Sequence, residues 1–351
     1  MNTFVLILSI MLFIPLPAKS ADEIINTMDV QGNLPRLRFS PYKDVGISMN
    51  WNTNVISTAV TGTLQPLLAV LPGTTRRTVT WAFATGECGS ENWAGLEPDA
   101  LANANVPLFV AAKVNYIIST GGAAGAFTCS SANGLRAFIN RYASSRLIGL
   151  DFDIEAGQSA AAINSLVDQV AAVQAEYPGL RFSFTVATLG SDDGQVLSRP
   201  YGDLNVTGYT VLQAIQRAKL QRYAVNLMTM DYGTPSPSVC VVANGLCDMG
   251  RTAIQAARNL HDKFGIPFAN IELTPMIGRN DVVDEVFTRK NADVMIDWAK
   301  ANGLAGVHFW SFDRDTPCRL PYASPTCSST PGVPTLSYTR RFRWRVASAT
   351  P

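Results

Sequence analysis

The sequence predicts an α/β protein built as one (β/α)8 barrel, the TIM barrel, in a single domain. Eight strand-like runs alternate with segments of helical periodicity in the 351-residue chain, which is the pattern of consecutive βα units. A doubly wound sheet usually shows a glycine-rich phosphate loop after an early strand, and no G-x-G-x-x-G or Walker motif occurs here. The fourth run also ends in acidic residues, which a barrel places at its mouth.

The predicted strands are short runs rich in β-branched and aromatic residues, and they follow one another along the whole chain. They cover residues 36–45, 79–84, 114–120, 146–155, 181–188, 223–230, 270–277 and 306–312. Apolar residues at helical spacing predict helices between them, most clearly over 161–179, 252–265 and 287–303. Pro178-Gly179 ends the first of these helices, and Gly265 and Gly303 end the other two.

Both ends of the chain differ from the barrel pattern. An apolar run from Phe4 to Leu16, followed by Ala18-Lys19-Ser20, predicts a signal peptide over residues 1–20. This run is too short to span a membrane, so a soluble, secreted product is expected, extracellular or periplasmic, with no membrane contact after cleavage. We expect residues 21–35 to be a lead-in, 36–323 the barrel domain, and 324–351 a Pro/Ser/Thr-containing C-terminal tail whose "RRFRWR" is a solvated strand or tail.

Composition excludes several classes of function. With 47% hydrophobic and 16% charged residues the chain is globular, and a net charge of +1 offers no electrostatic footprint for nucleic acid. Six cysteines in an exported chain predict disulfides. Sequence proximity favours Cys240 with Cys247 and Cys318 with Cys327, leaving Cys88 with Cys129, although six cysteines allow 15 pairings. We expect no zinc site, because there is no Cys-x-x-Cys motif and the two histidines are not near any cysteine pair. We also expect no cofactor and a monomer.

The segment "IGLDFDIE" at 148–155 is the strongest functional signal. Asp151, Asp153 and Glu155 occupy alternate positions and share one face of the strand, while apolar residues form the other face. An edge strand usually carries mixed polar residues instead, and a calcium loop of the EF-hand type needs ligands after Glu155 that are absent. Three unpaired carboxylates in a row therefore predict a catalytic site.

This segment resembles the acidic signature of family 18 glycoside hydrolases, the chitinases and their relatives. Three further segments are similar to that family: "STGG" at 119–122, "MTMDYG" at 228–233 and Trp310 in "HFWSFD". Ile148 stands where many members have an acid, and Met230 where many have a tyrosine. The forms "MDYG" and "WSFDRDTPC" look closest to a bacterial and archaeal chitinase subgroup. The resemblance spans residues 36 to 315 and implies a catalytic (β/α)8 barrel.

The resemblance implies a role for each acid. Glu155 is the candidate general acid, because nearby like charges keep its carboxyl protonated near neutral pH. Asp153 orients the substrate's acetamide, whose own oxygen attacks, and Asp151 pairs with Asp153. Since a thioether donates no hydrogen bond, Tyr232 would reach over Met230 to the acetamide carbonyl, with Asp231 beside it.

Aromatic and strand-end residues complete the predicted site. Trp310 is expected to form the platform beneath the reacting sugar, while Trp81 and Phe83 are either sugar contacts or core residues. Met228 and Met230 are expected to face the substrate. We interpret His308 as a hydrogen-bonded barrel residue and 313–315 as a salt-bridge corner.

The implied activity is hydrolysis of chitin, a β-1,4-linked polymer of N-acetylglucosamine, with retention. Two alternatives remain open from the sequence. An endo-β-N-acetylglucosaminidase acting on glycoprotein glycans or on peptidoglycan would use the same chemistry. A chitin-binding lectin would share the fold, but such relatives commonly lack the acid at the position of Glu155.

Overall fold

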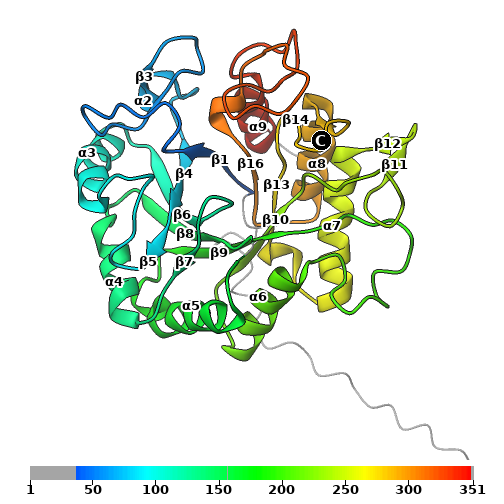
Figure 1. The fold of residues 1–351 in the computed structure, drawn as a ribbon, viewed down its shortest axis with the longest axis horizontal. Helices are drawn as coiled ribbons and strands as arrows, with labels where there is room; N and C mark the ends of the chain where they lie inside the picture. Colours follow the sequence, from blue (N-terminus) through cyan, green and yellow to red (C-terminus); the bar gives the residue numbers. More distant parts are fainter. Residues whose placement is uncertain (1–36, 156, 349–351) are drawn as a thin grey trace, which may run out of the picture. The chain divides into compact units, whose positions relative to one another are not determined.

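The computed structural model describes residues 37–155 and 157–348, in which eight parallel strands form a closed barrel (Figure 1). Around the barrel the strand order is β1-β16-β13-β10-β9-β8-β6-β4. The strands are β1 (Arg38–Asp44), β4 (Thr78–Ala84), β6 (Asn115–Gly121), β8 (Leu147–Asp153), β9 (Arg181–Ala187), β10 (Ala224–Met228), β13 (Ile271–Thr274) and β16 (Gly306–Phe309). The predicted (β/α)8 fold is therefore confirmed. The predicted signal peptide and lead-in lie outside the described residues.

Helices connect the strands on the outside of the barrel (Figure 1). They are α2 (Leu67–Val70), α3 (Pro98–Ala111), α4 (Ala132–Arg141), α5 (Ala160–Val173), α6 (Val206–Arg217), α7 (Met249–Phe264), α8 (Arg289–Ala301) and α9 (Ser337–Ala347). Polar side chains explain where several begin, because Ser159, Asn205 and Asp248 each accept a hydrogen bond from the first helical turn. Gly265 ends α7 with a positive φ of 68°, as its sequence position predicts.

The connecting loops contain four short strand pairs and three 3-10 turns among the described residues. The pairs are β2 (Ser57–Thr58) with β3 (Gln65–Pro66), β5 (Gly86–Glu87) with β7 (Phe127–Thr128), β11 (Val242–Ala243) with β12 (Leu246–Cys247), and β14 (Gly278–Arg279) with β15 (Val286–Phe287). The turns are η1 (Gln174–Glu176), η2 (Phe268–Asn270) and η3 (Phe312–Arg314). Most of these pairs border the loops at the carboxyl ends of the barrel strands.

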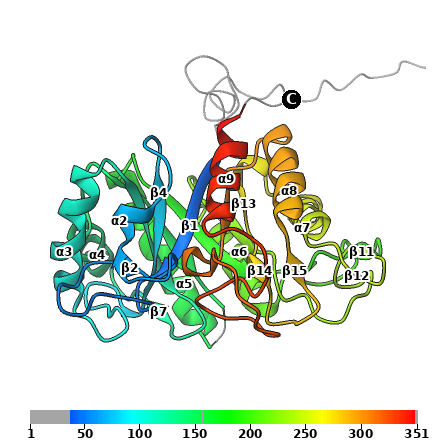
Figure 2. The same ribbon diagram turned by 90° about the horizontal axis from the view of Figure 1, so that it is seen from above.

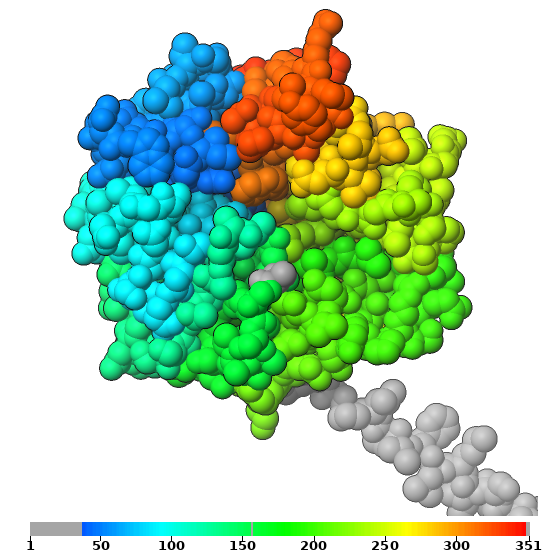
Figure 3. All heavy atoms as spheres, viewed as in Figure 1, coloured from blue at the N-terminus to red at the C-terminus, as the bar shows by residue number. Residues whose placement is uncertain are grey.

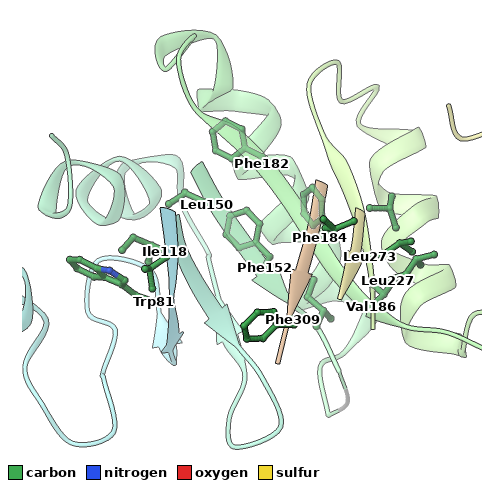
Figure 4. Packing of buried hydrophobic residues seen from close by; sticks show 14 of the residues in the cluster. Trp81, Ile118, Leu150, Phe152, Phe182, Phe184, Val186, Leu227, Leu273 and Phe309 are labelled. Atoms are coloured by element: carbon green, nitrogen blue, oxygen red, sulfur yellow. The ribbon is translucent and has the colours of Figure 1, made fainter. Parts of the chain in front are cut away.

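Alternation along the strands separates an apolar outer layer from a polar interior. Leu150 and Phe152 of β8 pack with Phe184 of β9 and its neighbours between the sheet and the helices (Figure 4). Side chains of the opposite parity point into the barrel, where Thr274 donates to Asn226 at 2.8 Å. Period-two alternation thus frees the inner face for polar groups.

Helix α9 corrects the expectation of a solvated C-terminal tail. Residues 337–347 form a helix that lies beside β1 and α8 (Figure 2). Phe342 is fully buried, with its ring centroid 5.2 Å from those of Phe39 and Phe309. Arg341 and Arg345 of the basic run pair with Asp293 of α8. The arginines of the basic run therefore belong to the polar face of an amphipathic helix. The basic composition of the run gave no indication of its apolar face.

All six cysteines are paired in the described chain, as Cys88–Cys129, Cys240–Cys247 and Cys318–Cys327. This is the pairing that sequence proximity favours. Among the described helices, none combines the length and the apolar character needed to cross a membrane.

Candidate active site

A cavity of about 560 Å³ opens at the carboxyl ends of the barrel strands. Figure 3 shows the molecule hollowed near the middle of this face. The last residues of three strands line the cavity, Asp153 of β8, Ala187 of β9 and Met228 of β10, and Glu155 follows closely after β8. The predicted acids and the mouth of the barrel therefore coincide.

Asp151 lies deepest of the three acids and is saturated with hydrogen bonds. Oδ2 accepts from Tyr42 Oη at 2.8 Å and from Ser119 Oγ at 2.7 Å. Oδ1 accepts from Ser183 Oγ at 2.5 Å and from Thr185 Oγ1 at 2.7 Å. Four hydroxyl groups from three strands hold this carboxylate in place, and none of them is a partner of Asp153.

Asp153 and Glu155 have the opposite surroundings. Asp153 is 4% exposed, and its Oδ1 has no hydrogen-bond partner among the described residues. Burial raises the pKa of Asp153 well above its usual range, and the carboxylates of Glu155 and Asp151 raise it further. Burial also raises the pKa of Glu155, and a backbone hydrogen bond from Ala123 offsets part of that rise. The pair can hold a proton at a pH where isolated carboxyls are ionised.

Two aromatic side chains form one wall of the cavity. The rings of Phe83 and Trp310 stack with centroids 5.5 Å apart and planes inclined by 21°, and both line the cavity. Trp310 lies at the cavity, where the sequence predicted it, and Phe83 lies beside it. A flat apolar surface of this kind suits the C–H face of a sugar ring.

Trp81 is a core residue, which decides between the two interpretations that the sequence left open. It is fully buried, stacks on Tyr116 at 4.5 Å and meets Phe109 of α3 at 4.8 Å. Trp81 and Phe83 would share one face of a regular strand. The pairing of β4 with β6 shifts register between Trp81 and Ala84, and this irregularity turns Phe83 alone toward the cavity.

The loop that follows β10 directs Tyr232 differently from the prediction. Met228, Met230 and Asp231 line the cavity, whereas Tyr232 does not and is 4% exposed. The expected alternation assumed that the strand continues to Tyr232. Instead β10 ends at Met228 and Asp231 adopts a positive φ of 53°, which exchanges the directions of Asp231 and Tyr232. Tyr232 as the donor to an acetamide carbonyl is therefore wrong.

Sequence reasoning missed the hydroxyl and amide groups beneath the acids. Tyr42 donates to Asp151 and accepts from Asn226 Nδ2 at 2.9 Å, so it links three strands under the cavity. Thr185 also joins this network. The available signal was the alternation along β9, in which Ser183 and Thr185 are each flanked by apolar residues.

The remaining predictions concern residues around β16. His308 is buried and its Nδ1 lies 3.1 Å from the carbonyl oxygen of Ser40, in agreement with a barrel role. Asp313 pairs with buried Lys43 at 2.8 Å. Arg314 donates to main-chain carbonyls, and Asp315 accepts N–H groups at the start of α9, so only Asp313 forms the expected salt bridge.

Comparisons with known proteins give two partial sequence matches, and no protein-family model matches the chain. A probable bifunctional chitinase/lysozyme of Escherichia coli (strain K12) is 34% identical over 125 residues, and endochitinase 11 of Metarhizium anisopliae is 33% identical over 128 residues. These matches cover 32% and 33% of this chain but only 14% and 24% of the two relatives.

The structural comparison extends over most of the barrel. The catalytic domain of a hyperthermophilic chitinase from Pyrococcus furiosus superposes with a TM-score of 0.67 at 26% identity. The superposition covers 90% of this chain and 98% of that domain. Catalytic site mutants of active domain 2 of a thermostable chitinase from the same organism were solved in complex with chito-oligosaccharides.

Proposed function

Because this chain superposes on a chitinase catalytic domain over nine-tenths of its length, we propose that it hydrolyses β-1,4 bonds between N-acetylglucosamine units, with Glu155 as the general acid. The observation that supports this most strongly is the contrast among the three acids. Asp151 is held by four hydroxyl donors, while Asp153 and Glu155 face the cavity with raised pKa values.

In the first step Glu155 gives its proton to the glycosidic oxygen as the bond between that oxygen and the anomeric carbon breaks. The carbonyl oxygen of the substrate's own acetamide forms the new bond to the anomeric carbon, which produces a cyclic oxazolinium ion. Oδ1 of Asp153 accepts the acetamide N–H, and its negative charge stabilises the ion. The unpartnered oxygen of Asp153 supports this role.

In the second step water attacks the anomeric carbon from the side that the leaving sugar vacated. Glu155, now ionised, takes the proton of that water, and the acetamide oxygen leaves. Two inversions at one carbon give net retention. Trp310 and Phe83 form the platform under the reacting sugar, and Met228 and Met230 pack against its other edges.

The three disulfides support a secreted enzyme, since such bonds persist in oxidising compartments. The near-neutral net charge supports a neutral glycan rather than nucleic acid as the partner. The two proposed steps use only side chains of this chain and groups of the substrate.

The test compares chitotetraose with cellotetraose, which has the same length but no acetamide. Cleavage of chitotetraose alone, with β-anomeric products by NMR at early times, is expected, and a thiazoline mimic of the oxazolinium ion should inhibit. Efficient cleavage of cellotetraose would point to a nucleophile on the protein instead. Release of glycan from a high-mannose glycopeptide, without cleavage of chitotetraose, would overturn the chitin assignment.

A further inference from the structure

A buried carboxyl group lies behind one wall of the cavity. Glu285 is 1% exposed, does not line the cavity, and has no part in the proposed reaction. It ends the loop between β14 and β15 and directly precedes Val286, the first residue of β15. Burial of a carboxylate is costly unless its oxygens are hydrogen-bonded, so the partners of Glu285 show what it holds in place.

Both oxygens of Glu285 accept main-chain hydrogen bonds from the loop that follows β10. Oε2 accepts from the N–H of Tyr232 at 3.1 Å, and Oε1 accepts from the N–H of Gly233 at 3.0 Å. Consecutive N–H groups that point at one anion form the concave arrangement known as a nest. The carboxylate of one loop therefore holds the main chain of another.

The turn that Glu285 holds carries part of the cavity wall. Met230 and Asp231 line the cavity and directly precede the two N–H groups. Asp231 has a positive φ of 53°, which is uncommon for a residue other than glycine, so this turn needs contacts that stabilise it. Loss of the two hydrogen bonds would allow the turn to relax and Met230 to leave its place in the wall.

The loop that carries Glu285 is itself well fixed. Asn280 N–H donates to the carbonyl oxygen of Glu285, and Glu285 N–H donates to that of Val282, both at 2.9 Å. Val282 N–H donates in turn to Oδ1 of Asp231 at 3.0 Å, so hydrogen bonds run in both directions between the two loops. Asn280 Nδ2 also donates at 2.9 Å to the carbonyl oxygen of Met276, which lines the cavity. Glu285 thus connects the turn after β10 to a rigid part of the barrel rim.

The two oxygens of Glu285 have N–H donors, but no cation contributes to its pKa among the described residues. Burial raises the pKa of Glu285 to about 7, the N–H groups of residues 231–233 offset part of the rise, and the carboxylate of Asp231 adds to it. The carboxyl group therefore changes its charge near neutral pH.

The ionisable groups that face Glu285 come from the loop after β10. They are the carboxyl group of Asp231 and the phenol of Tyr232, and Glu285 helps to raise the pKa of that phenol. Arg314 of η3 acts on the pKa of Asp231 instead. Arg279 of β14 donates to the carbonyl oxygen of Val283 in the loop of Glu285. Ionisation of Glu285 is thus the change of charge closest to the two N–H groups.

Only the ionised form of Glu285 offers two oxygens that are both free to accept. A protonated carboxyl group carries its hydrogen on one oxygen, which leaves a single good acceptor for two N–H groups. Hydrogen bonds to an ionised carboxylate are also about twice as strong as those between neutral groups. The turn is therefore held firmly above about pH 7 and more weakly below it.

We propose that Glu285 is a positioning residue of the substrate site, which acts by holding the turn that presents Met230 and Asp231 to the sugar. This inference rests on the proposed function, because the affinity for chitotetraose reports on the turn. Glu285 does not touch the reacting atoms, so its loss should change substrate affinity more than the chemical step.

Glu285→Gln tests this role, because an amide keeps the shape of the side chain and, like the protonated carboxyl group, has one good acceptor oxygen. At about pH 8.5, KM for chitotetraose should rise about threefold to tenfold, with kcat within about twofold of wild type. At about pH 5.5, Glu285 of the wild type is itself protonated, so the ratio of the two KM values should approach one. The ratio cancels the titration of Asp153 and Glu155, which both enzymes share.

Asp284→Asn is the matched control. It removes an exposed carboxylate one residue before Glu285 that does not line the cavity. KM and kcat should stay within about twofold of wild type at both pH values. An increase of KM equal to that of Glu285→Gln would show that the charge of the loop, rather than the seat of Glu285 on the two N–H groups, determines the effect.

Hydrogen exchange in the wild-type chain tests the hold on the turn without any substitution. After correction for the intrinsic effect of pH, the amides of Tyr232 and Gly233 should be about threefold less protected at about pH 6 than at about pH 8. Equal protection at the two pH values would overturn the inference, even where the Glu285→Gln chain does not fold.

A KM ratio that is the same at both pH values, or a kcat that falls as far as KM rises, would also overturn the inference alone, provided that wild type cleaves chitotetraose. Failure of wild type to cleave chitotetraose would overturn the proposed function, and hydrogen exchange would still decide whether Glu285 holds the turn.

Discussion

Two groups of carboxylates inside this barrel show how position decides what the same side chain does. Near the amino ends of the strands, Glu272 contacts Arg181 and lies 3.4 Å from Nε2 of His308. Burial alone would raise the pKa of Glu272, but Arg181 and His308 outweigh it and lower the value to about 2. At the mouth, Asp153 is buried and Glu155 is half-buried, no cation contributes to either among the described residues, and their pKa values rise.

The difference in pKa between the two groups separates carboxylates that stabilise the fold from carboxylates that can take part in catalysis. Arg181 and His308 hold the lower carboxylate through its Oε2, so it contributes to folding and can neither give nor take a proton near neutral pH. The carboxylates at the mouth have no cation beside them among the described residues, which makes them costly to the fold and available to a substrate. An acid paired with cations stabilises the fold, and acids without a cation, on a different part of the barrel, are left for chemistry.

The largest effect should follow from removing the proton at the mouth. Glu155→Gln keeps the shape of the side chain but cannot act as an acid, so kcat for chitotetraose should fall by about 100-fold to 10,000-fold. Binding of the oligosaccharide, measured by calorimetry, should be largely retained. If the variant keeps more than about a tenth of the wild-type rate, another group is the acid and the mouth is not set apart in this way.

The lower group should respond in stability rather than in rate. The shift of Glu272 from 4.5 to about 2 corresponds to about 3 kcal/mol of folding free energy. Because the folded pKa is depressed, this contribution is complete above about pH 5 and is lost as the pH falls toward 2. Glu272→Gln should therefore unfold more easily than wild type in urea at neutral pH, and the gap should narrow in acid.

A matched control is Asp99→Asn, which removes an ion pair to Arg141 from a side chain that is 77% exposed. That pair should contribute less than about 1 kcal/mol at any pH. A Glu272→Gln variant that matches this control would show that the buried group contributes no more to stability than the surface pair.

The smallest effect on activity should come from substitution of Tyr232. It tests whether this side chain belongs to the residues that contact the substrate. Since Tyr232 does not line the cavity, Tyr232→Phe should change kcat and KM for chitotetraose by less than about twofold. Asp231→Asn, one residue earlier and in the cavity wall, should raise KM more. A tenfold loss of kcat in Tyr232→Phe would restore this hydroxyl as a donor to the substrate.

The barrel and the acid row could be predicted because both depend on period-two alternation in regular strands. The structure departs from prediction where regularity stops. Neither the irregular pairing of β4 after Trp81 nor the positive φ of Asp231 has a sequence mark, because neither position is a glycine. Tyr42 escaped notice for another reason, since its importance comes from contacts with residues more than 100 positions away.

Helix α9 also gives the molecule an order of assembly. Phe342 covers Phe39 of the first barrel strand and Phe309 of the last, so the seam between them is sealed by an element that follows both in the chain. During translation β1 leaves the ribosome before β16, and α9 follows both. Although β1 and β16 can pair before α9 is made, their rings are covered only after synthesis has passed residue 347, and a chain that stops earlier leaves Phe39 and Phe309 exposed along the seam.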